Sequence, residues 1–120
     1  MPDRLFIDWI EYPHAQLRFD LETERGTPAR FLIQLEYCVE GDWVPVAHFD
    51  HNPEGTYGHD VTEEGLHLDI YRDGEQVRTK RDFPTVPLSN APDYYVSYLK
   101  TNADPLLRRF EQWHSLTTDR

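Results

Sequence analysis

Two stretches of strict alternation between apolar and polar residues constrain the fold of this chain most. In residues 15–22 the odd positions are apolar and the even positions are polar, and residues 31–39 keep apolar side chains at every odd position. A period of two is typical of strands that bury one face. The turn-forming sequence Glu-Arg-Gly-Thr-Pro at 24–28 lies between the two stretches. The sequence therefore predicts an antiparallel hairpin of two half-buried strands.

Further strand patterns precede and follow this hairpin, at residues 5–10, 43–50, 66–71 and 77–80. The first is of mixed polarity, with apolar residues on both sides and Asp8 among them, and we expect it to be buried on both faces. Pro45 cannot donate a ladder hydrogen bond, which predicts an edge position or a bulge. Gly41-Asp42 and Asp73-Gly74 are strong signals for tight turns. We therefore expect residues 1–82 to form an antiparallel meander of about six strands.

The remaining residues predict a different kind of structure. Residues 83–89 contain two prolines and should form an extended linker. Apolar side chains at helical spacing predict helices within 90–116, with Asn90 as N-cap and Asp93 at the capping-box position. Pro105 either kinks this helical segment or begins a second helix. The predicted fold class is a single α+β domain over 1–120, with the C-terminal helical segment packed on one face of the sheet.

Charge and hydropathy narrow the classes of function. The chain has 22 acidic and 12 basic residues, a formal net charge of −10, which suits a salt-adapted cytoplasm and disfavours a protein that coats DNA or RNA. No apolar run is long enough for a transmembrane segment, and the N-terminus lacks a signal-peptide pattern. A lone cysteine excludes an internal disulfide. We therefore expect a cytoplasmic protein without a membrane role.

Histidine and aspartate gather in residues 48–69, which hold four of the six histidines: His48, His51, His59 and His67. Alternation places His48 with Asp50 on one strand face and His67 with Asp69 on another, and these polar faces meet only if the two strands pair. Imidazole and carboxylate together suit a first-row metal ion or a metal-free acid/base pair. The open alternative is a solvated strand face that binds nothing.

These residues define two chemical schemes. In the metal-free scheme His59 and His67 are the catalytic acid and base, and Asp50 and Asp69 orient them. In the metal scheme His48 and His51 of the same segment are candidate ligands of a divalent transition metal ion, namely zinc, manganese or nickel.

The only concentration of basic residues follows the histidine-rich segment. Within it, Arg72 and Lys80 are candidate phosphate-binding residues, since guanidinium and ammonium groups both bind phosphate oxygens. The alternative is a set of cross-strand ion pairs with acidic neighbours. Motifs for a nucleophilic serine, a phosphate loop or a dinucleotide site are absent from the sequence.

Residues 47–53 (Ala-His-Phe-Asp-His-Asn-Pro) and 58–74, from Gly58-His59-Asp60 to Arg72-Asp73-Gly74, resemble a family of small uncharacterised haloarchaeal proteins. More distantly, residues 44–115 resemble the TumE-like toxins of toxin–antitoxin pairs, where an Arg-Tyr-Asp-Asn strand end precedes spaced histidines, a hairpin and a C-terminal helix. Asp50 and the spacing of the histidines fit, whereas histidines replace the arginine and asparagine around the aspartate. This resemblance implies a toxin that acts on cellular RNA, with an antitoxin as its partner.

Three hypotheses of function follow. The leading one is a small toxin-like or defence-associated protein that cleaves RNA with the His/Asp residues. The others are a non-catalytic protein–protein interaction module, which we expect to be a homodimer, and a metal-binding protein without catalysis. A concave site where these side chains converge would favour an enzyme or metal site, and dispersed side chains would favour the interaction module.

Overall fold

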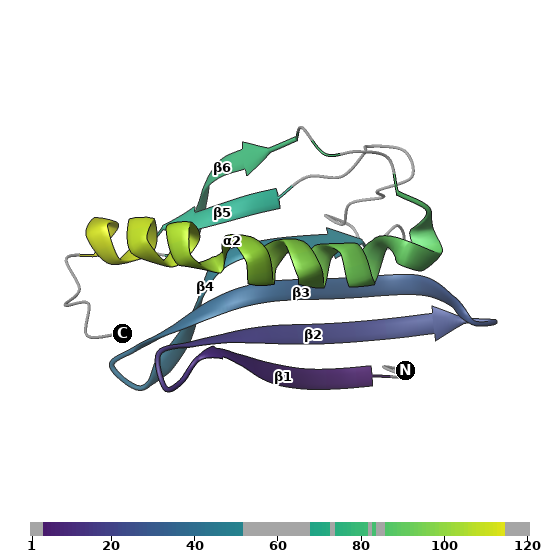
Figure 1. Ribbon diagram of the computed structural model, residues 1–120, viewed down its shortest axis with the longest axis horizontal. Coiled ribbons are helices and arrows are strands. Elements are labelled where there is room, and N and C mark those ends of the chain that lie inside the picture. Colours follow the sequence, from purple (N-terminus) through teal and green to yellow (C-terminus); the bar gives the residue numbers. More distant parts are fainter. Residues whose placement is uncertain (1–3, 52–67, 73, 82, 84–85, 115–120) are drawn as a thin grey trace.

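The fold is a six-stranded antiparallel sheet covered on one face by a C-terminal helix, as seen in a computed structural model (Figure 1). The structure describes residues 4–51, 68–72, 74–81, 83 and 86–114. Each strand pairs with the next in sequence order, which confirms the α+β class and the meander. The strands are β1 (Arg4–Glu11), β2 (Ala15–Glu24), β3 (Thr27–Val39), β4 (Asp42–His51), β5 (Leu68–Arg72) and β6 (Glu75–Lys80).

The hairpin of β2 and β3 follows the alternating pattern. Leu17 pairs with Leu35 and Phe19 with Ile33, and all four side chains are buried on the face toward the helix. At the turn, Gly26 has a φ of +80°, a left-handed conformation that glycine adopts without steric cost. The predicted hairpin is confirmed.

Strand β1 differs from the prediction of burial on both faces. It pairs with β2 alone and forms an edge of the sheet, where Ile7 and Trp9 remain 49% and 48% exposed. Asp8, on the helix side, receives Lys100 Nζ of the helix at 2.8 Å. The hydrogen bond and charge of Lys100 hold the pKa of Asp8 below its usual range. An edge strand here keeps only half of its side chains near the core, because on the face away from the helix Trp9 meets the rings of Tyr12 and Trp43 but stays half exposed.

The predicted irregularity at Pro45 is a β-bulge. Leu35 pairs with Ala47, but the next residue of β3, Glu36, pairs with Pro45, so Val46 is the extra residue. Beyond the bulge, β4 pairs with β5 through Ala47 and its neighbour in the strand. The bulge therefore precedes the part of β4 that pairs with both neighbouring strands.

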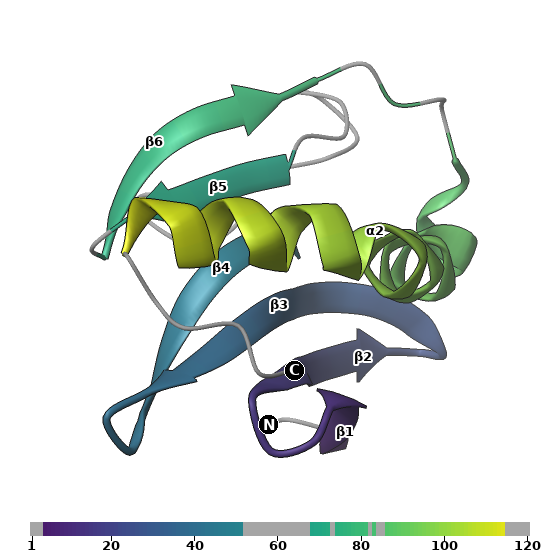
Figure 2. The ribbon, with the colours of Figure 1, turned by 60° about the vertical axis from the view of Figure 1, so that its left-hand side comes forward.

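The predicted helical segment is one helix, α2 (Ala91–Trp113), which follows the 3-10 turn η1 (Leu88–Asn90). Pro105 lies inside the helix, and Figure 2 shows its two halves running in different directions, so the alternative of a kink is the correct one. The predicted capping box is wrong: Asn90 makes no side-chain cap hydrogen bond, since its backbone is already in the αR region (φ −101°, ψ −9°) at the end of the 3-10 turn.

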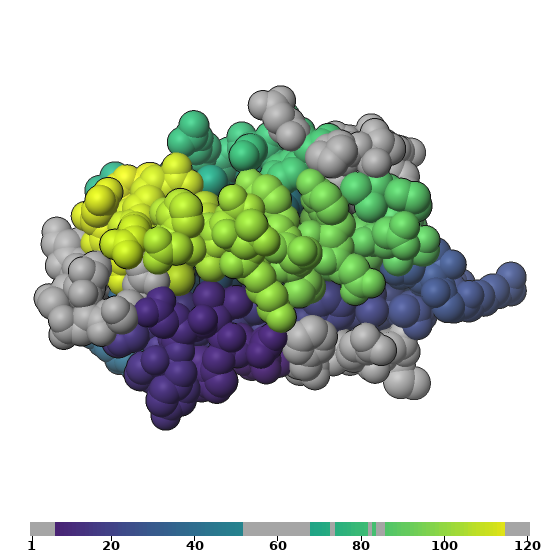
Figure 3. All heavy atoms as spheres, in the orientation of Figure 1, coloured from purple at the N-terminus to yellow at the C-terminus, as the bar shows by residue number. Residues whose placement is uncertain are grey.

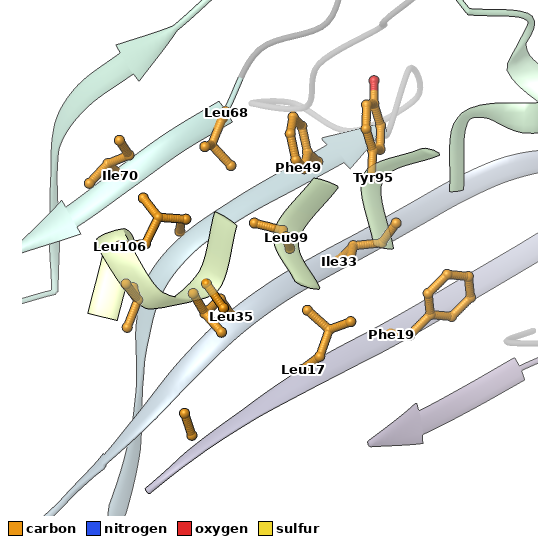
Figure 4. Close-up of a cluster of buried hydrophobic side chains, with 14 of the residues drawn as sticks. Leu17, Phe19, Ile33, Leu35, Phe49, Leu68, Ile70, Tyr95, Leu99 and Leu106 are labelled. Atoms are coloured by element: carbon orange, nitrogen blue, oxygen red, sulfur yellow. The ribbon is translucent and has the colours of Figure 1, made fainter. Parts of the chain in front are cut away.

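Helix α2 packs mainly on β3 and β4 and encloses the core (Figure 4). At its centre the rings of Phe49 and Tyr95 stack with centroids 4.0 Å apart and planes inclined by 3°. In Figure 3 the helix fills the middle of this face, with β1 on one side and the β5–β6 hairpin on the other. Among the described residues, no helix is long and apolar enough to cross a bilayer.

Candidate functional site

A group of acidic and imidazole side chains lies on the sheet face opposite α2, where β4 meets β5. His48 and Asp69 are direct cross-strand partners, and Asp50 shares their face two residues along β4. The polar faces of these two strands therefore coincide, as the sequence predicts for strands that pair. We call His48, Asp50 and Asp69 the His/Asp cluster.

The three side chains of the His/Asp cluster converge. His48 Nε2 lies 3.4 Å from Asp69 Oδ2 and 3.9 Å from Asp50 Oδ1, and one ligand atom from each residue lies within 4.8 Å of the others. The side chains of His48 and Asp50 are 15% and 22% exposed, and that of Asp69 is 2% exposed. The cluster is thus recessed into the sheet surface but keeps contact with solvent.

Hydrogen bonds on β3 orient the imidazole. Gln34 Nε2 donates to Glu36 Oε2 at 2.6 Å, which turns Gln34 Oε1 toward His48 Nδ1 at 3.2 Å. An amide oxygen only accepts, so His48 Nδ1 carries the proton of this hydrogen bond. His48 Nε2 is consequently the nitrogen that faces the carboxylates of Asp50 and Asp69.

The orienting hydrogen bonds continue to β2. Glu36 is buried and accepts from Gln16 Nε2 at 2.7 Å through its other carboxylate oxygen. Arg18 Nε lies 3.4 Å from Glu36 Oε2 and supplies the opposite charge. Because the Glu36 oxygens are held by groups from two strands, Gln34 has a fixed partner, and the orientation of His48 is set by the sheet itself.

A second set of contacts holds the cluster from β5 and β6. Thr79 Oγ1 donates to Asp69 Oδ1 at 3.0 Å, and Gln76 Nε2 donates to Thr79 Oγ1 at 2.7 Å. Tyr71 places its hydroxyl 3.2 Å from His48 Nε2. Burial raises the pKa of Tyr71, and the charges of Asp69 and Asp50 raise it further, so its hydroxyl keeps its proton.

The arrangement can take up positive charge in two ways. His48 can bind a proton at Nε2 and form an ion pair with the carboxylates, or the nitrogen and two carboxylate oxygens can bind one cation together. In either case the cation sits between groups from neighbouring strands and would hold β4 to β5.

Two predicted metal ligands are not brought together. His51 follows His48 by three residues, so strand alternation places it on the helix side of β4, where it is 3% exposed and its ring lies 5.4 Å from that of Phe31. Asp50 and Asp69 instead share the cluster with His48. The predicted catalytic residues His59 and His67 lie outside the described residues.

The predicted phosphate-binding residues lie on the helix side of the sheet. The Arg72 guanidinium is 5.6 Å from the ring centroid of Trp113, and Lys80 Nζ donates to Tyr98 OH at 3.2 Å. By strand alternation, Arg72 and Lys80 point to the face of the sheet opposite the Asp69 side chain. The structure therefore divides the predicted residues between two faces of the sheet.

Sequence reasoning missed Gln34, Glu36 and Thr79 as supporting residues. The alternation in residues 31–39 already places Gln34 and Glu36 on the polar face, which is the signal that could have found them. Their proximity to His48 follows from the register of β3 with β4, in which Gln34 pairs directly with His48.

Comparisons with known proteins address the family but no activity. Neither a curated protein nor a solved structure matches the chain. The resemblance to TumE-like toxins and to haloarchaeal proteins therefore stays a prediction. The sequence profile of the family described as "Domain of unknown function (DUF7718)" matches residues 1–116, and the chain belongs to this family.

Proposed function

We propose that the chain binds a divalent first-row transition metal ion at the His/Asp cluster. The observation that carries this proposal is the convergence of one imidazole nitrogen and two carboxylate oxygens within 4.8 Å of one another. Nitrogen and oxygen ligands bind such ions at about 2.0–2.2 Å, so two ligands on opposite sides of an ion are about 4.2 Å apart. Rotation of the three side chains would have to bring these atoms closer together to reach bonding distance.

The hydrogen bonds around the cluster support metal binding. Gln34 holds the proton of His48 on Nδ1 and leaves Nε2 to bind the ion. Thr79 fixes one oxygen of Asp69 and leaves Oδ2 facing His48. Outer contacts of this kind orient ligands and raise the affinity of metal sites.

The ligand types favour particular ions. Imidazole suits zinc, iron and nickel, and carboxylates suit manganese, so a set of one nitrogen and two oxygens fits Zn²⁺ or Mn²⁺ better than a soft ion such as Cu⁺. Two carboxylates also cancel the charge of a divalent ion, which lowers the cost of holding it in a recessed site.

Titration calorimetry of the chelator-treated protein with Zn²⁺, Mn²⁺ and Ni²⁺ tests the proposal. We expect one ion per chain, and a loss of more than about 100-fold in affinity in the Asp69→Asn and His48→Gln variants, because each removes a direct ligand. The matched controls are Asp42→Asn, an exposed residue of β4, and His14→Gln, which lies outside the cluster.

Circular dichroism must show that all four variants are folded. If none of the three ions binds, or if the cluster variants bind like the wild type, the proposal is wrong. Such a result would leave the non-catalytic interaction module, with His48 acting only as a hydrogen-bonding residue of the sheet.

A second candidate function is metal-assisted cleavage of RNA. The observation that favours it is that the described part of the chain supplies three ligand atoms, and a site with three protein ligands leaves a coordination position for water. A bound metal ion lowers the pKa of such a water and makes it a nucleophile near neutral pH. The acid and base roles of His59 and His67 remain predictions from the sequence.

Cleavage of a fluorescent RNA oligonucleotide, with Zn²⁺ or Mn²⁺ present, separates this candidate from metal binding alone. We expect the Asp69→Asn variant to lose cleavage and the Asp42→Asn control to retain it. His59→Ala and His67→Ala variants that remain folded and cleave like the wild type would exclude the predicted acid/base pair. Metal binding without any cleavage would leave the first proposal standing and reject the second.

A further inference from the structure

A cavity of about 560 Å³ lies between the β5–β6 hairpin and the second half of α2. One wall comes from β5, β6 and the residue after β6, and the other from the helix between Tyr98 and Arg109. Helix α2 packs mainly on β3 and β4, and the β5–β6 hairpin lies beside the helix, above it in the views of Figures 1 and 2. This arrangement leaves the cavity between them. It is on the opposite face of the sheet from the His/Asp cluster.

Four positively charged side chains line this cavity: Arg78, Lys80, Arg81 and Arg109. No aspartate or glutamate is among the described residues that line it. The chain as a whole has a net charge of −10, with 12 basic against 22 acidic residues. A third of the basic residues therefore line one cavity in a strongly acidic protein.

The four cations keep their charges available. Within the described part of the chain, none of them forms an ion pair with a carboxylate. Lys80 Nζ donates to the hydroxyl of Tyr98, and the Arg109 guanidinium lies 5.3 Å from the ring centroid of Trp113. Both are neutral partners, so an anion entering the cavity would not have to displace a carboxylate of the described residues.

The cavity also has an apolar part. Leu68 and Ile70 of β5 and Leu106 of α2 contribute to its lining beside the ring of Tyr98. Small-molecule sites commonly measure about 300–1,000 Å³ and combine apolar walls with a few polar groups that set orientation. A bare phosphate ion would fill only a small part of a cavity of about 560 Å³.

We propose that this cavity binds a small organic phosphate of about the size of a nucleoside diphosphate. The arginines and Lys80 would bind the phosphate oxygens, since guanidinium groups match phosphate geometry, and the apolar wall would contact the organic part. A small ligand is favoured over a long nucleic acid because the acidic surface repels an extended polyanion at low salt. The charged groups of this inference differ from those of the metal proposal, because alternate residues of β5 serve the two faces. The two sites share Thr79, which lines the cavity and also donates to Asp69 of the His/Asp cluster.

Titration calorimetry with ADP tests the proposal, in low-salt buffer containing a chelator so that metal binding has no influence. We expect the Arg78→Gln and Arg109→Gln variants to weaken ADP binding about tenfold each, the loss expected for one charge-assisted hydrogen bond. The matched control is Arg108→Gln, which removes the same charge from the neighbouring helix position but does not line the cavity.

Three results would overturn the proposal. The first is the absence of ADP binding to the wild type at millimolar concentration. The second is an equal loss of affinity in Arg108→Gln and Arg109→Gln, which would indicate general electrostatic attraction. The third is an RNA oligonucleotide that binds more tightly than ADP and depends on the same arginines, which would assign the cavity to a polymer.

Discussion

His48 on β4 and Asp69 on β5 are direct cross-strand partners, with Nε2 and Oδ2 3.4 Å apart. Among the described residues, these two strands have one further pair of directly opposed residues, Ala47 and Ile70. A short pairing therefore holds the two halves of the His/Asp cluster together. A metal ion bound there would link the strands directly, and it would stabilise the folded state because the unfolded chain does not keep these ligands together.

Replacement of Gln34 tests the orientation of the imidazole. Gln34→Leu removes the acceptor of the His48 Nδ1 proton without touching a ligand atom. We expect the affinity for Zn²⁺ to fall about 10- to 100-fold, the usual effect of losing such an outer contact. Calorimetry would measure the change, with Gln112→Leu on the exposed side of α2 as control. An unchanged affinity would mean that the imidazole is held by other contacts.

Removal of the Asp69 charge should change the ionisation of Tyr71. Burial is the largest cause of its raised pKa, and the charge of Asp69 is the next. We therefore expect the Asp69→Asn variant to lower the pKa of Tyr71 while leaving it above the ordinary value of about 10. NMR titration of protein labelled with ¹³C at tyrosine Cζ would measure it, and a Tyr71→Phe variant would assign the signal. A pKa that rises in Asp69→Asn contradicts this prediction.

The hydroxyl group of Tyr95 should lower the free energy of unfolding relative to a phenylalanine at the same position. It is buried and has no hydrogen-bond partner among the described residues, so we expect Tyr95→Phe to increase the free energy of unfolding by about 1 kcal/mol at neutral pH. Urea denaturation would measure this, with the exposed Tyr12→Phe as control. A decrease in the free energy of unfolding would show that the hydroxyl has a stabilising partner.

The raised pKa of Tyr95 predicts that the free energy of unfolding falls at alkaline pH. Burial raises the pKa of Tyr95 in the folded state. As the pH rises above about 10, the unfolded chain loses this proton first, so the free energy of unfolding falls. We expect a shallower fall in Tyr95→Phe than in the wild type, measured by urea denaturation across this pH range. Parallel curves for the two proteins would contradict the prediction.

Phe49 should be a major contributor to the core. Its ring stacks on Tyr95 and lies 5.3 Å from that of Phe83, and the side chain is 1% exposed. We expect Phe49→Ala to cost about 3–5 kcal/mol, because it leaves a cavity between the sheet and the helix. Denaturant unfolding would measure the loss, and Val77→Ala, which changes a half-exposed residue of β6, should cost far less. Similar losses in both variants would contradict the packing described for Phe49.

Much of the fold could be predicted from local patterns in the sequence, namely apolar/polar alternation and the positions of prolines. The alternation in β2 and β3 identified which side chains of each strand face the core, and Pro45 indicated the bulge. Strand β1 was harder, because its apolar side chains do not show that Ile7 and Trp9 stay about half exposed on the face away from the helix. The helix begins directly after Asn90, as predicted, but the 3-10 turn at Leu88–Asn90 leaves the Asn90 side chain without the predicted capping hydrogen bond.

The candidate site could be predicted only in part. The period of two placed His48 with Asp50 on one face, and the same rule separates His51 from them. Gln34 and Thr79 could not be assigned to the site without knowing which residue of the neighbouring strand each one meets. The basic residues were recognised as a group, but Arg109, which completes the cavity, comes from a distant part of the sequence.

The sequence by itself determined the buried faces of β2 and β3, the order of the elements and the α+β class, because side-chain alternation and turn chemistry act over a few residues. Only the tertiary structure decided that His48 meets Asp69 and that Lys80 faces the helix rather than the His/Asp cluster. These relationships depend on strand register and on which face the helix covers. Both are set by the packing of the whole core, which no short segment of sequence contains.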